Sequence, residues 1–410
     1  MIDSNKKLKK FFNTEFDKLR EEGQIEENTS EYFGLIGSTQ IEDIPYIKQL
    51  EVKIASLKDI YEKLIDISLL ENIQIVPSDK IYEYRFRMDY VTCYDPIFEP
   101  NNRLGQRKHG RYNIVVDMHK PVLFKDEWFQ KVRKIYEFLQ SKGIENYDLV
   151  KHTGNLRYLV IRADEMSLLS IVTKTNNSPE VLEEAAMMAL ELGFSSVYWL
   201  VNDSIRDESD GEVENFWGKE LIEVNIKLSF INRDFYVSHN TFFQNNINVF
   251  KKISEHIYNY LNTKDKVNTT LLDMFSGVGV LGILFSDMFE SIIGYEINSD
   301  SIELANKNLE LNKITNATYE ARDLLQENSY LDFENATVIV DPPRTGLTSK
   351  FTSKLLEMLP KEIIYISCNP VTQAVDLSDL NGKYRTVSIK GFDMFPHTYH
   401  LENVIILERK

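Results

Sequence analysis

Ser276-Gly277-Val278-Gly279-Val280-Leu281-Gly282 follows directly on the strand-like run Thr269–Phe275 and leads into a helical pattern. Glycines at these three spacings permit a tight turn, a close approach of the backbone to a ligand, and close packing of the helix on the strand. The next apolar run, Ser291–Tyr295, ends at Glu296, 23 residues after Asp273. A carboxylate at the end of the second strand of such a unit is placed to accept hydrogen bonds from ribose hydroxyls. The stretch therefore predicts a strand, turn and helix that bind a cofactor containing a nucleoside.

The sequence on either side of this unit indicates three parts. After Asn240, helical and strand-like runs alternate, which is typical of a doubly wound parallel sheet. Residues 80–235 mix short β-rich runs with two helical stretches, Lys125–Gln140 and Pro179–Leu192, which favours an α+β domain built on a mostly antiparallel sheet. We therefore expect a charged N-terminal arm over residues 1–44, a central α+β domain over residues 45–235, and a Rossmann-like α/β domain over residues 236–410.

The composition limits the class of protein. Of the 410 residues, 43% are hydrophobic and 11% aromatic, which is enough for large cores. Two cysteines exclude a disulfide framework, and there is neither a signal sequence nor an apolar run of about 18 residues, so we expect a cytoplasmic protein without membrane spans. The net charge of −16 argues against a surface that is basic throughout, but a local basic groove would still bind phosphates. A monomer is the default expectation.

Polar motifs follow the later strand-like runs. In Asp341-Pro342-Pro343-Arg344 the rigid Pro-Pro turn would hold the aspartate over the crevice in which open α/β sheets bind ligands. Cys368 lies in Ser367-Cys368-Asn369-Pro370, directly after an apolar run, and Glu402 lies 34 residues further on. A cysteine displayed on a turn, together with a carboxylate, predicts a nucleophile and an acid/base group. The alternatives are a small buried cysteine and a glutamate that only opens the last strand.

Two further carboxylates bear on the type of cofactor, which the glycine loop alone does not determine. Asp273, two residues before Phe275, favours S-adenosylmethionine over a dinucleotide, because a buried carboxylate there can meet the ammonium group of that cofactor. Asp323, after the third strand-like run, is equally suited to accept a hydrogen bond from an adenine amino group and to cap a helix.

In this order, the motifs resemble those of the RNA (uracil-5-)methyltransferase family. The resemblance covers the last 170 residues densely and the middle of the chain more loosely. It implies an S-adenosylmethionine-dependent enzyme, Rossmann-like in its C-terminal domain, that methylates C5 of a uridine in RNA. The matching segments are Phe243-Gln244-Asn245-Asn246, the Asp273–Gly279 loop, Asp341-Pro342-Pro343-Arg344, Ser367-Cys368-Asn369-Pro370, and Phe395-Pro396 with His400-Leu401-Glu402.

The resemblance also implies roles for single residues. C5 of uracil is a weak nucleophile, and addition of a Cys368 thiolate to C6 would make it reactive, after which Glu402 would remove the C5 proton. For this chemistry we expect the thiol pKa, ~8.5 in a free cysteine, to be lowered by a polar or cationic environment and the pKa of Glu402 to be raised. The residues implied to bind the cofactor are Gln244, Asp273, Phe275, Gly277, Gly279, Glu296, Asp323 and Asp341, the last of which would also reach the base.

Basic residues predict where RNA binds. A strand over Tyr84-Arg85-Phe86-Arg87 would present both arginines on one face, and residues 103–111 carry four cations in nine positions of expected loop. In an acidic protein such runs favour a phosphate groove over solvated surface charge. The target uridine is expected to leave its stack to expose C6. The expected RNA contacts are Arg85, Arg87, Arg107, Lys108, Arg111 and Arg344.

The N-terminal half bears on the kind of RNA. In the ribosomal-RNA branch of the family four cysteines hold an iron–sulfur cluster; here the corresponding positions read Ser30, Ile36, Thr39 and Lys120, so we expect neither a cluster nor another metal. The N-terminal RNA-binding β-barrel of that branch is not indicated either, since residues 1–29 lack strand signals. The cysteine-free segment and Arg107-Lys108-His109-Gly110 favour 23S ribosomal RNA, with the T-loop uridine of transfer RNA as the close alternative.

Two other functions fit parts of the sequence. A cytosine-C5 methylase also uses a cysteine thiolate, but those enzymes place it after a proline in a different layout, and Asp341-Pro342-Pro343-Arg344 contains no cysteine. A catalytically idle RNA-binding protein is the other, and the presence of both Cys368 and Glu402 argues against it.

Overall fold

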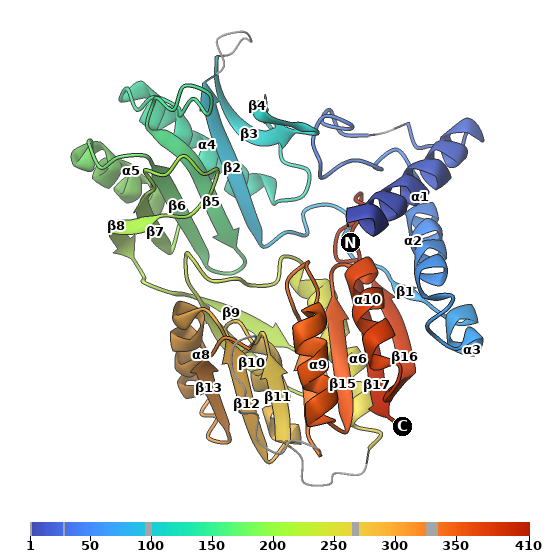
Figure 1. Ribbon diagram of the computed structural model, residues 1–410. Helices are drawn as coiled ribbons and strands as arrows, with labels where there is room; N and C mark the ends of the chain where they lie inside the picture. Colours follow the sequence, from blue (N-terminus) through green and yellow to red (C-terminus); the bar gives the residue numbers. More distant parts are fainter. Residues whose placement is uncertain (1, 28, 95–100, 265–269, 325–334) are drawn as a thin grey trace.

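The computed structural model describes residues 2–27, 29–94, 101–264, 270–324 and 335–410, which form two lobes (Figure 1). Within these residues, the strands form an eight-stranded sheet in the C-terminal lobe, a seven-stranded sheet in the central lobe, and a two-stranded hairpin. Thr269, with which the first strand of the cofactor unit was expected to begin, lies outside the described residues.

The C-terminal lobe has the predicted Rossmann-like sheet, in the order β1-β16-β17-β15-β14-β11-β12-β13. Neighbouring strands are parallel except where β17 is involved. From β11 the sheet extends through β12 and β13 on one side and through β14 and β15 on the other, so the strand order changes direction at β11. Ligands of open α/β sheets bind at such a switch point. The strands are β1 (Ile75–Val76), β11 (Thr270–Met274), β12 (Ser291–Glu296), β13 (Ala317–Ala321), β14 (Thr337–Val340), β15 (Glu362–Ser367), β16 (Tyr384–Phe392) and β17 (Glu402–Arg409).

The helices of this lobe pack an apolar stripe against the sheet. In α6, Val249, Phe250, Ile253 and Ile257 are buried at helical spacing, and the helix begins where the Asn246 side chain accepts a hydrogen bond from Val249 N. The helices are α6 (Ile247–Leu261), α7 (Val280–Leu284), α8 (Ser299–Leu311), α9 (Thr348–Met358) and α10 (Pro370–Leu380), with a 3₁₀ turn at Ser286–Met288.

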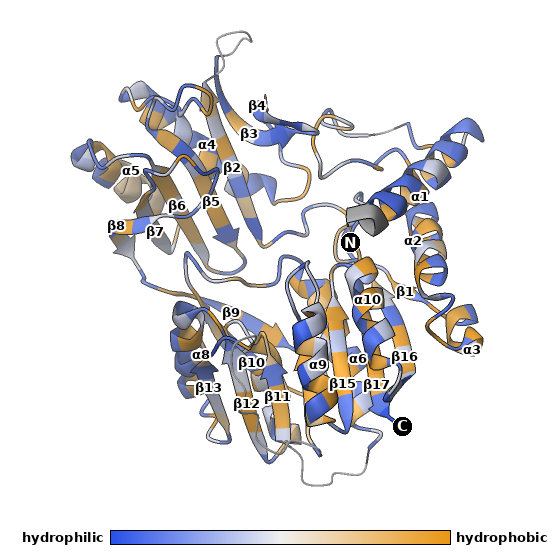
Figure 2. Cartoon of the chain, in the orientation of Figure 1, coloured by the Kyte–Doolittle hydropathy of each residue, from blue (hydrophilic) through white to orange (hydrophobic). Residues whose placement is uncertain are grey.

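The central lobe has a mostly antiparallel sheet, as predicted, in the order β4-β3-β2-β5-β6-β7-β8; only β6 and β7 are parallel. Helices α4 and α5 pack on one face, and the inner strands β5 and β6 are buried along their whole length. Hydrophobic residues make up much of both strands (Figure 2). The elements are β2 (Arg87–Tyr94), β3 (Asn102–Lys108), β4 (Arg111–Asp117), α4 (Asp126–Ser141), β5 (Leu156–Ala163), β6 (Ser167–Thr173), α5 (Pro179–Glu191), β7 (Ser196–Val201) and β8 (Glu212–Gly218).

The basic stretch 103–111, expected to be a loop, is a β-hairpin. It comprises most of β3 and the start of β4, joined by a turn in which Gly110 has φ 72°. Most residues in this stretch are polar on both faces of the strands, so the sequence lacks the alternation of apolar and polar residues by which a strand is predicted.

The segment from residue 46 to residue 76, expected to belong to the central domain, packs on the C-terminal sheet instead. Strand β1 pairs in parallel with β16, and Leu57 and Tyr61 of α2 lie in one buried cluster with Phe351 and Tyr384. The apolar spacing predicted the helix correctly, but an apolar stripe does not specify which sheet it covers. The N-terminal helices are α1 (Ile2–Glu21), α2 (Tyr46–Tyr61) and α3 (Ile67–Glu71).

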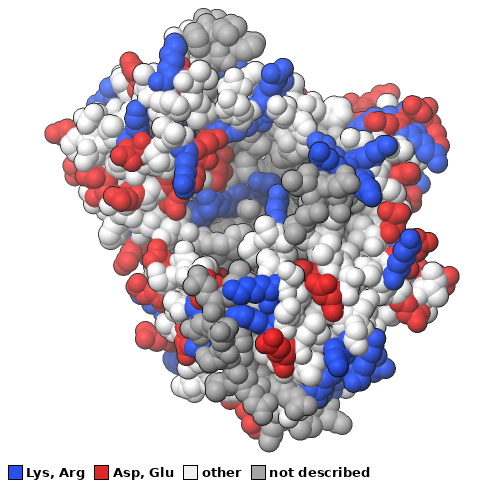
Figure 3. All heavy atoms as spheres, viewed as in Figure 1, with Lys and Arg blue, Asp and Glu red and all other residues white. Residues whose placement is uncertain are grey.

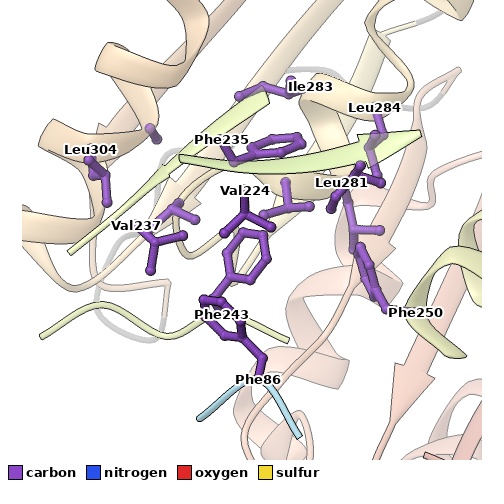
Figure 4. Close-up of a cluster of buried hydrophobic side chains, with 14 of the residues drawn as sticks. Phe86, Val224, Phe235, Val237, Phe243, Phe250, Leu281, Ile283, Leu284 and Leu304 are labelled. Atoms are coloured by element: carbon purple, nitrogen blue, oxygen red, sulfur yellow. The ribbon is translucent and has the colours of Figure 1, made fainter. Parts of the chain in front are cut away.

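The expected boundary at residue 235 falls inside a hairpin of β9 (Ile222–Lys227) and β10 (Asn232–Val237), which packs on the helices of the C-terminal lobe. Figure 4 shows Val224 and Phe235 of this hairpin beside Leu281 of α7. Phe243 and Phe86 extend the same cluster towards the central lobe, with ring centroids 5.6 Å apart. One hydrophobic cluster therefore joins the two lobes, and their relative position is fixed by packing.

Candidate active site

The residues singled out in the C-terminal half converge on one edge of the eight-stranded sheet. Asp273 and Glu296 lie at the ends of the parallel strands β11 and β12, and Asp341 and Cys368 follow the ends of β14 and β15. Glu402 is the first residue of β17, but β17 is antiparallel, so its start lies at this same edge; Ser367 is paired with Asn403. The reversal of one strand thus brings the glutamate beside the cysteine.

The glycine loop after β11 has the conformation that its sequence predicts. Phe275, Gly277 and Gly279 all have positive φ, of 62°, 52° and 80°. The Glu296 carboxylate accepts hydrogen bonds from the backbone N–H of Gly277, at 3.2 Å, and of Ile297, at 2.8 Å. Glu296, whose carboxylate is predicted to bind ribose hydroxyls, therefore also holds the glycine loop at the end of β12.

Tyr319 in β13, which the sequence analysis missed, fills the space beneath this loop. Its hydroxyl donates to Gly279 O at 3.1 Å and also approaches the buried Asp273. A Cβ on Gly282 would lie 2.3 Å from the hydroxyl oxygen, and one on Gly294 would lie 2.1 Å from the ring. The third glycine of the motif therefore makes room for a tyrosine rather than for a ligand. No local pattern in the sequence links Tyr319 to glycines so far away along the chain.

The segment Phe243-Gln244-Asn245-Asn246 connects three parts of the molecule. The amide of Gln244 lies 3.5 Å from the Asp341 carboxylate. Asn245 accepts from the backbone N–H of Phe86, at 2.7 Å, and of Arg87, at 3.1 Å. The Asn246 amide donates to Met394 O at 3.2 Å. The two asparagines hold Gln244 between the lobes and beside the loop that leads to Glu402.

Cys368 and Arg344 lie on two turns that are joined to each other. Asn369 and Thr372 at the start of α10 donate to the Arg344 carbonyl oxygen, at 3.1 and 3.3 Å. Cys368, directly before Asn369, is half-buried. The Arg344 side chain is exposed but within hydrogen-bonding reach of the thiol.

The electrostatics of the catalytic residues differ from one sequence-based expectation. Burial raises the pKa of the Cys368 thiol to about 12, and the charges of Glu402 and Asp341 add to this, while Arg344 opposes it. The expected lowering of the thiol pKa was wrong, because burial disfavours the charged thiolate and the two neighbouring carboxylates add to this effect. Burial and the neighbouring Asp341 raise the pKa of Glu402 well above its usual range, as expected.

Asp341 and Asp273 form the acidic centre of the edge. Burial and the charge of Asp273 raise the pKa of Asp341 to about 7, and burial raises the pKa of Asp273 to about 7. Carboxyl groups crowded in this way favour the arrival of a positive charge. Asp323, which was predicted either to bind the adenine amino group or to cap a helix, is half-buried just after β13 at the same edge of the sheet.

A pocket of ≈ 560 Å³ opens at Cys368. Arg344, Asn369 and His400 line it on one side, and residues of the N-terminal helix α1 form part of the opposite wall. Its full lining is Leu8, Lys9, Phe12, Gln40, Arg344, Thr345, Cys368, Asn369, Pro370, Thr372, Tyr399, His400 and Leu401.

Helix α2 supports the loop that precedes Glu402, a role that the sequence analysis also missed. Lys53 and Asp393 are fully buried and pair at 2.7 Å, and the Gln49 side chain accepts from His397 N at 3.0 Å. Both partners on the loop follow β16, so α2 fixes the path of the chain from the end of that strand to Glu402.

The basic residues proposed for RNA are only partly brought to this pocket. Desolvation and the charges of Arg344, Lys53 and Arg85 lower the pKa of His400 to about 4, which places Arg85 near the pocket. Arg87 is instead paired with Asp89 at 2.7 Å, and Arg107 is paired with Asp207. Lys108 and Arg111 are exposed on the β3–β4 hairpin. In Figure 3, Lys and Arg side chains border the hollow between the lobes.

Of the four positions that correspond to cluster cysteines, Ile36, Thr39 and Lys120 contact Tyr32, whereas the Ser30 hydroxyl donates to Glu42 at 2.7 Å. The Tyr32 carbonyl oxygen accepts from Thr39 Oγ1 at 3.0 Å and Ile36 N at 3.4 Å, and its hydroxyl accepts from the backbone N–H of His119 at 2.9 Å and Lys120 at 3.5 Å. Within the described residues, no group of three or more His, Cys, Asp and Glu side chains is arranged to hold a metal ion. Nor is any helix of that part long and apolar enough to cross a membrane.

Comparisons with known proteins point to one family. A profile described as tRNA (Uracil-5-)-methyltransferase matches residues 216–410. The tRNA (uracil(54)-C(5))-methyltransferase of Pyrococcus abyssi is 33% identical over 379 residues, 91% of this chain and 84% of that protein. Its namesake from Pyrococcus horikoshii is 32% identical over 380 residues, 91% and 83% of the two chains. The crystal structure of the P. abyssi enzyme in complex with S-adenosyl-L-homocysteine matches with a TM-score of 0.73 and 31% identity, over 93% of this chain and 87% of that one.

Proposed function

The chain belongs to the tRNA (uracil-5-)-methyltransferase family, and we propose that it methylates C5 of the uridine at position 54 of transfer RNA. It is an S-adenosylmethionine-dependent RNA uracil-C5 methyltransferase. The two Pyrococcus relatives named above are tRNA (uracil(54)-C(5))-methyltransferases. The sequence-based preference for 23S ribosomal RNA has no comparable support, so transfer RNA, the alternative from the sequence, becomes the proposed substrate.

One observation carries the proposal: Cys368, Glu402 and Asp341 interact electrostatically at the end of the sheet, and Cys368 lines a pocket. A cysteine that only filled the core would have neither the carboxylates nor the pocket. The half-buried thiol and the buried glutamate are the nucleophile and the base that C5 methylation of a uracil needs.

The glycine loop and its carboxylates suit S-adenosylmethionine. A Cβ on Gly277 would meet no other atom within 4 Å, so the loop leaves open space there. Glu296 is placed for the ribose hydroxyls, and Asp273, Asp341 and Gln244 for the positively charged methionine part, with Phe275 and Asp323 at the border of the site. When bound, the cofactor supplies an electrophilic methyl group.

Cys368 begins the reaction on the RNA. Its thiolate adds to C6 of the uracil, and the electron pair of the C5–C6 double bond moves into an enolate, so that C5 becomes nucleophilic. Arg344, which is within hydrogen-bonding reach of the thiol, stabilises the thiolate against the two carboxylates. Asp341, whose carboxylate lies 3.5 Å from the Gln244 amide, orients the base.

Glu402 completes the reaction. Once C5 carries both the methyl group and its original hydrogen, the glutamate removes that proton, the C5–C6 double bond re-forms, and the C6–S bond breaks to release Cys368. Its burial makes it a stronger base than an exposed carboxylate. Because only the carboxylate can accept a proton, Glu402 must be deprotonated before this step.

The substrate is tested with purified protein and methyl-labelled S-adenosylmethionine. Three RNAs are compared: an unmodified transfer RNA transcript, the same transcript with cytidine at position 54, and 23S ribosomal RNA. We expect labelled 5-methyluridine in the first only. Equal labelling of both transcripts would refute position 54, and label in ribosomal RNA alone would refute transfer RNA. 5-Methylcytidine would move the protein to the cytosine-specific enzymes.

The raised thiol pKa leads to a second prediction. In a Cys93→Ala protein, where Cys368 is the remaining cysteine, we expect iodoacetamide alkylation of the ligand-free form to be slow at pH 8 and still to rise about tenfold per pH unit near pH 10, because only the thiolate reacts. Arg344→Gln should slow it further. The measurement is the alkylation rate by mass spectrometry, and a plateau below pH 9 would contradict the electrostatic account.

A further inference from the structure

Helix α1 forms part of the wall of the active-site pocket, although nothing in the C-terminal motifs anticipated a contribution from the N-terminus. Leu8, Lys9 and Phe12 line the pocket together with Cys368. Figure 1 shows the start of this helix above α10, beside the loop that leads into β17. α1 contacts both α2 and α10.

The position of α1 is fixed by aromatic stacking. The rings of Phe12 and Phe16 stack on Tyr399, with centroids 5.3 and 5.7 Å away, and the Tyr399 hydroxyl donates to Asn13 Oδ1 at 2.9 Å. Further along the helix, Arg20 forms a bidentate ion pair with Asp43, with a shortest distance of 2.6 Å. The helix is therefore held in place at several points and is not a loose arm.

Two exposed lysines of α1 lie at the pocket or one helical turn from it. Lys9 lines the pocket, and Lys6, one turn earlier, lies on the same side of the helix. Both side chains are exposed, and neither forms an ion pair with an acidic residue in the described part of the chain. Lys7 and Lys18 lie on the opposite flank at helical spacing. Of these four lysines, Lys6 and Lys9 therefore lie on one flank of the helix, and Lys7 and Lys18 lie on the other.

We propose that α1 is an RNA-contacting wall of the active site, in which Lys6 and Lys9 bind the phosphates next to the target uridine. The proposal rests on the proposed function, since it takes the RNA in the pocket to be the substrate. Leu8 and Phe12 line the pocket in which a base and ribose would lie, and Lys9 lines it as well, with Lys6 one helical turn earlier. In a chain of net charge −16, such local cations determine where a polyanion docks.

The opposing explanation is that α1 only covers the loop containing Tyr399. That role depends on Phe12 and Phe16 and does not require the lysine charges. The test therefore changes charge and leaves the aromatic anchor intact. A Lys6→Gln/Lys9→Gln protein is compared with a Lys7→Gln/Lys18→Gln protein, which loses the same net charge from the opposite flank.

Binding of the transfer RNA transcript is measured by fluorescence anisotropy at several salt concentrations, and methyl transfer is measured in parallel. For the pocket-side variant we expect Kd and the KM for RNA to rise on the order of tenfold, and the slope of log K against log salt to fall by about 1.4, with kcat and the KM for the cofactor unchanged. The opposite-flank variant should match the wild type.

Equal effects of the two variants, or no effect of either, would overturn the role of the lysines. Because anisotropy needs no turnover, this result is independent of the reaction. A wild-type protein that binds the transcript but forms no 5-methyluridine would refute the proposed function, while the comparison of the two variants would still decide whether α1 contacts RNA.

Discussion

Replacing Cys368 with alanine is expected to reduce methyl transfer to RNA by on the order of 10⁴-fold or more, because C5 of uracil is then left without activation. The loss should appear in kcat, since Cys368 forms a bond only after the RNA is in place. Cofactor binding should persist, because the glycine loop, Glu296 and Asp273 are untouched. The measurement is single-turnover transfer of label to the transcript, with cofactor affinity determined by calorimetry.

Cys93→Ala is the matched control. Cys93 is the other cysteine of the chain, and it is buried in β2, in the hydrophobic cluster that joins the lobes. Its replacement should lower stability by about 1 kcal/mol and leave turnover essentially unchanged. A Cys368→Ala protein that retained more than a few per cent of the wild-type rate would remove the covalent mechanism.

Glu402→Gln is expected to stop the reaction after methyl transfer, with an effect on turnover on the order of 10³-fold or more. An amide cannot take the C5 proton, so the bond between Cys368 and C6 cannot break. The protein should accumulate as a covalent adduct with methylated RNA, stable in denaturing gels and absent from a Glu402→Gln/Cys368→Ala double variant. A Glu402→Gln protein that turned over normally, or was inactive without any adduct, would assign proton removal to another group.

The same substitution has a predictable effect on stability. A carboxyl group whose pKa is raised by folding binds its proton more tightly in the native state, so the free energy of unfolding is greatest below the unfolded pKa, near 4, and falls as pH rises through the folded pKa. Glutamine removes this loss. Glu402→Gln should therefore have a higher Tm than the wild type at pH 8, and the difference should shrink towards pH 4. Thermal unfolding followed by circular dichroism tests this, and it also shows that the variant is folded.

The fold of the C-terminal half could be predicted because its signals are local. The glycine loop, its flanking strand and the turn after Val340 each occupy consecutive residues, and parallel strands bring their carboxyl ends to one edge. Asp341 and Cys368, which follow the adjacent parallel strands β14 and β15, are brought to that edge in this way. That Glu402 acts together with Cys368 was predicted only from the family resemblance, since the reversal of β17 has no local signature in the sequence.

What could not be predicted depends on contacts between distant residues. The stripe on α2 indicates a helix, yet only packing shows that it covers the C-terminal sheet. Tyr319 under the glycine loop is an ordinary strand residue in the sequence. The thiol pKa was predicted in the wrong direction for the same reason, because it depends on how deeply the fold buries Cys368 and on which carboxylates it brings near the thiol.

The most direct test of the account uses a transfer RNA transcript that carries 5-fluorouridine at position 54. Glu402 can remove a proton from C5 but cannot remove a fluorine atom. The intermediate should therefore remain attached to the protein after methyl transfer. With S-adenosylmethionine present, mass spectrometry of the digested complex should find the methylated fluorouridine on the peptide that contains Cys368. An adduct on another residue, or no adduct from a protein that methylates the matching uridine transcript, would contradict the central claim that Cys368 attacks C6 of that base.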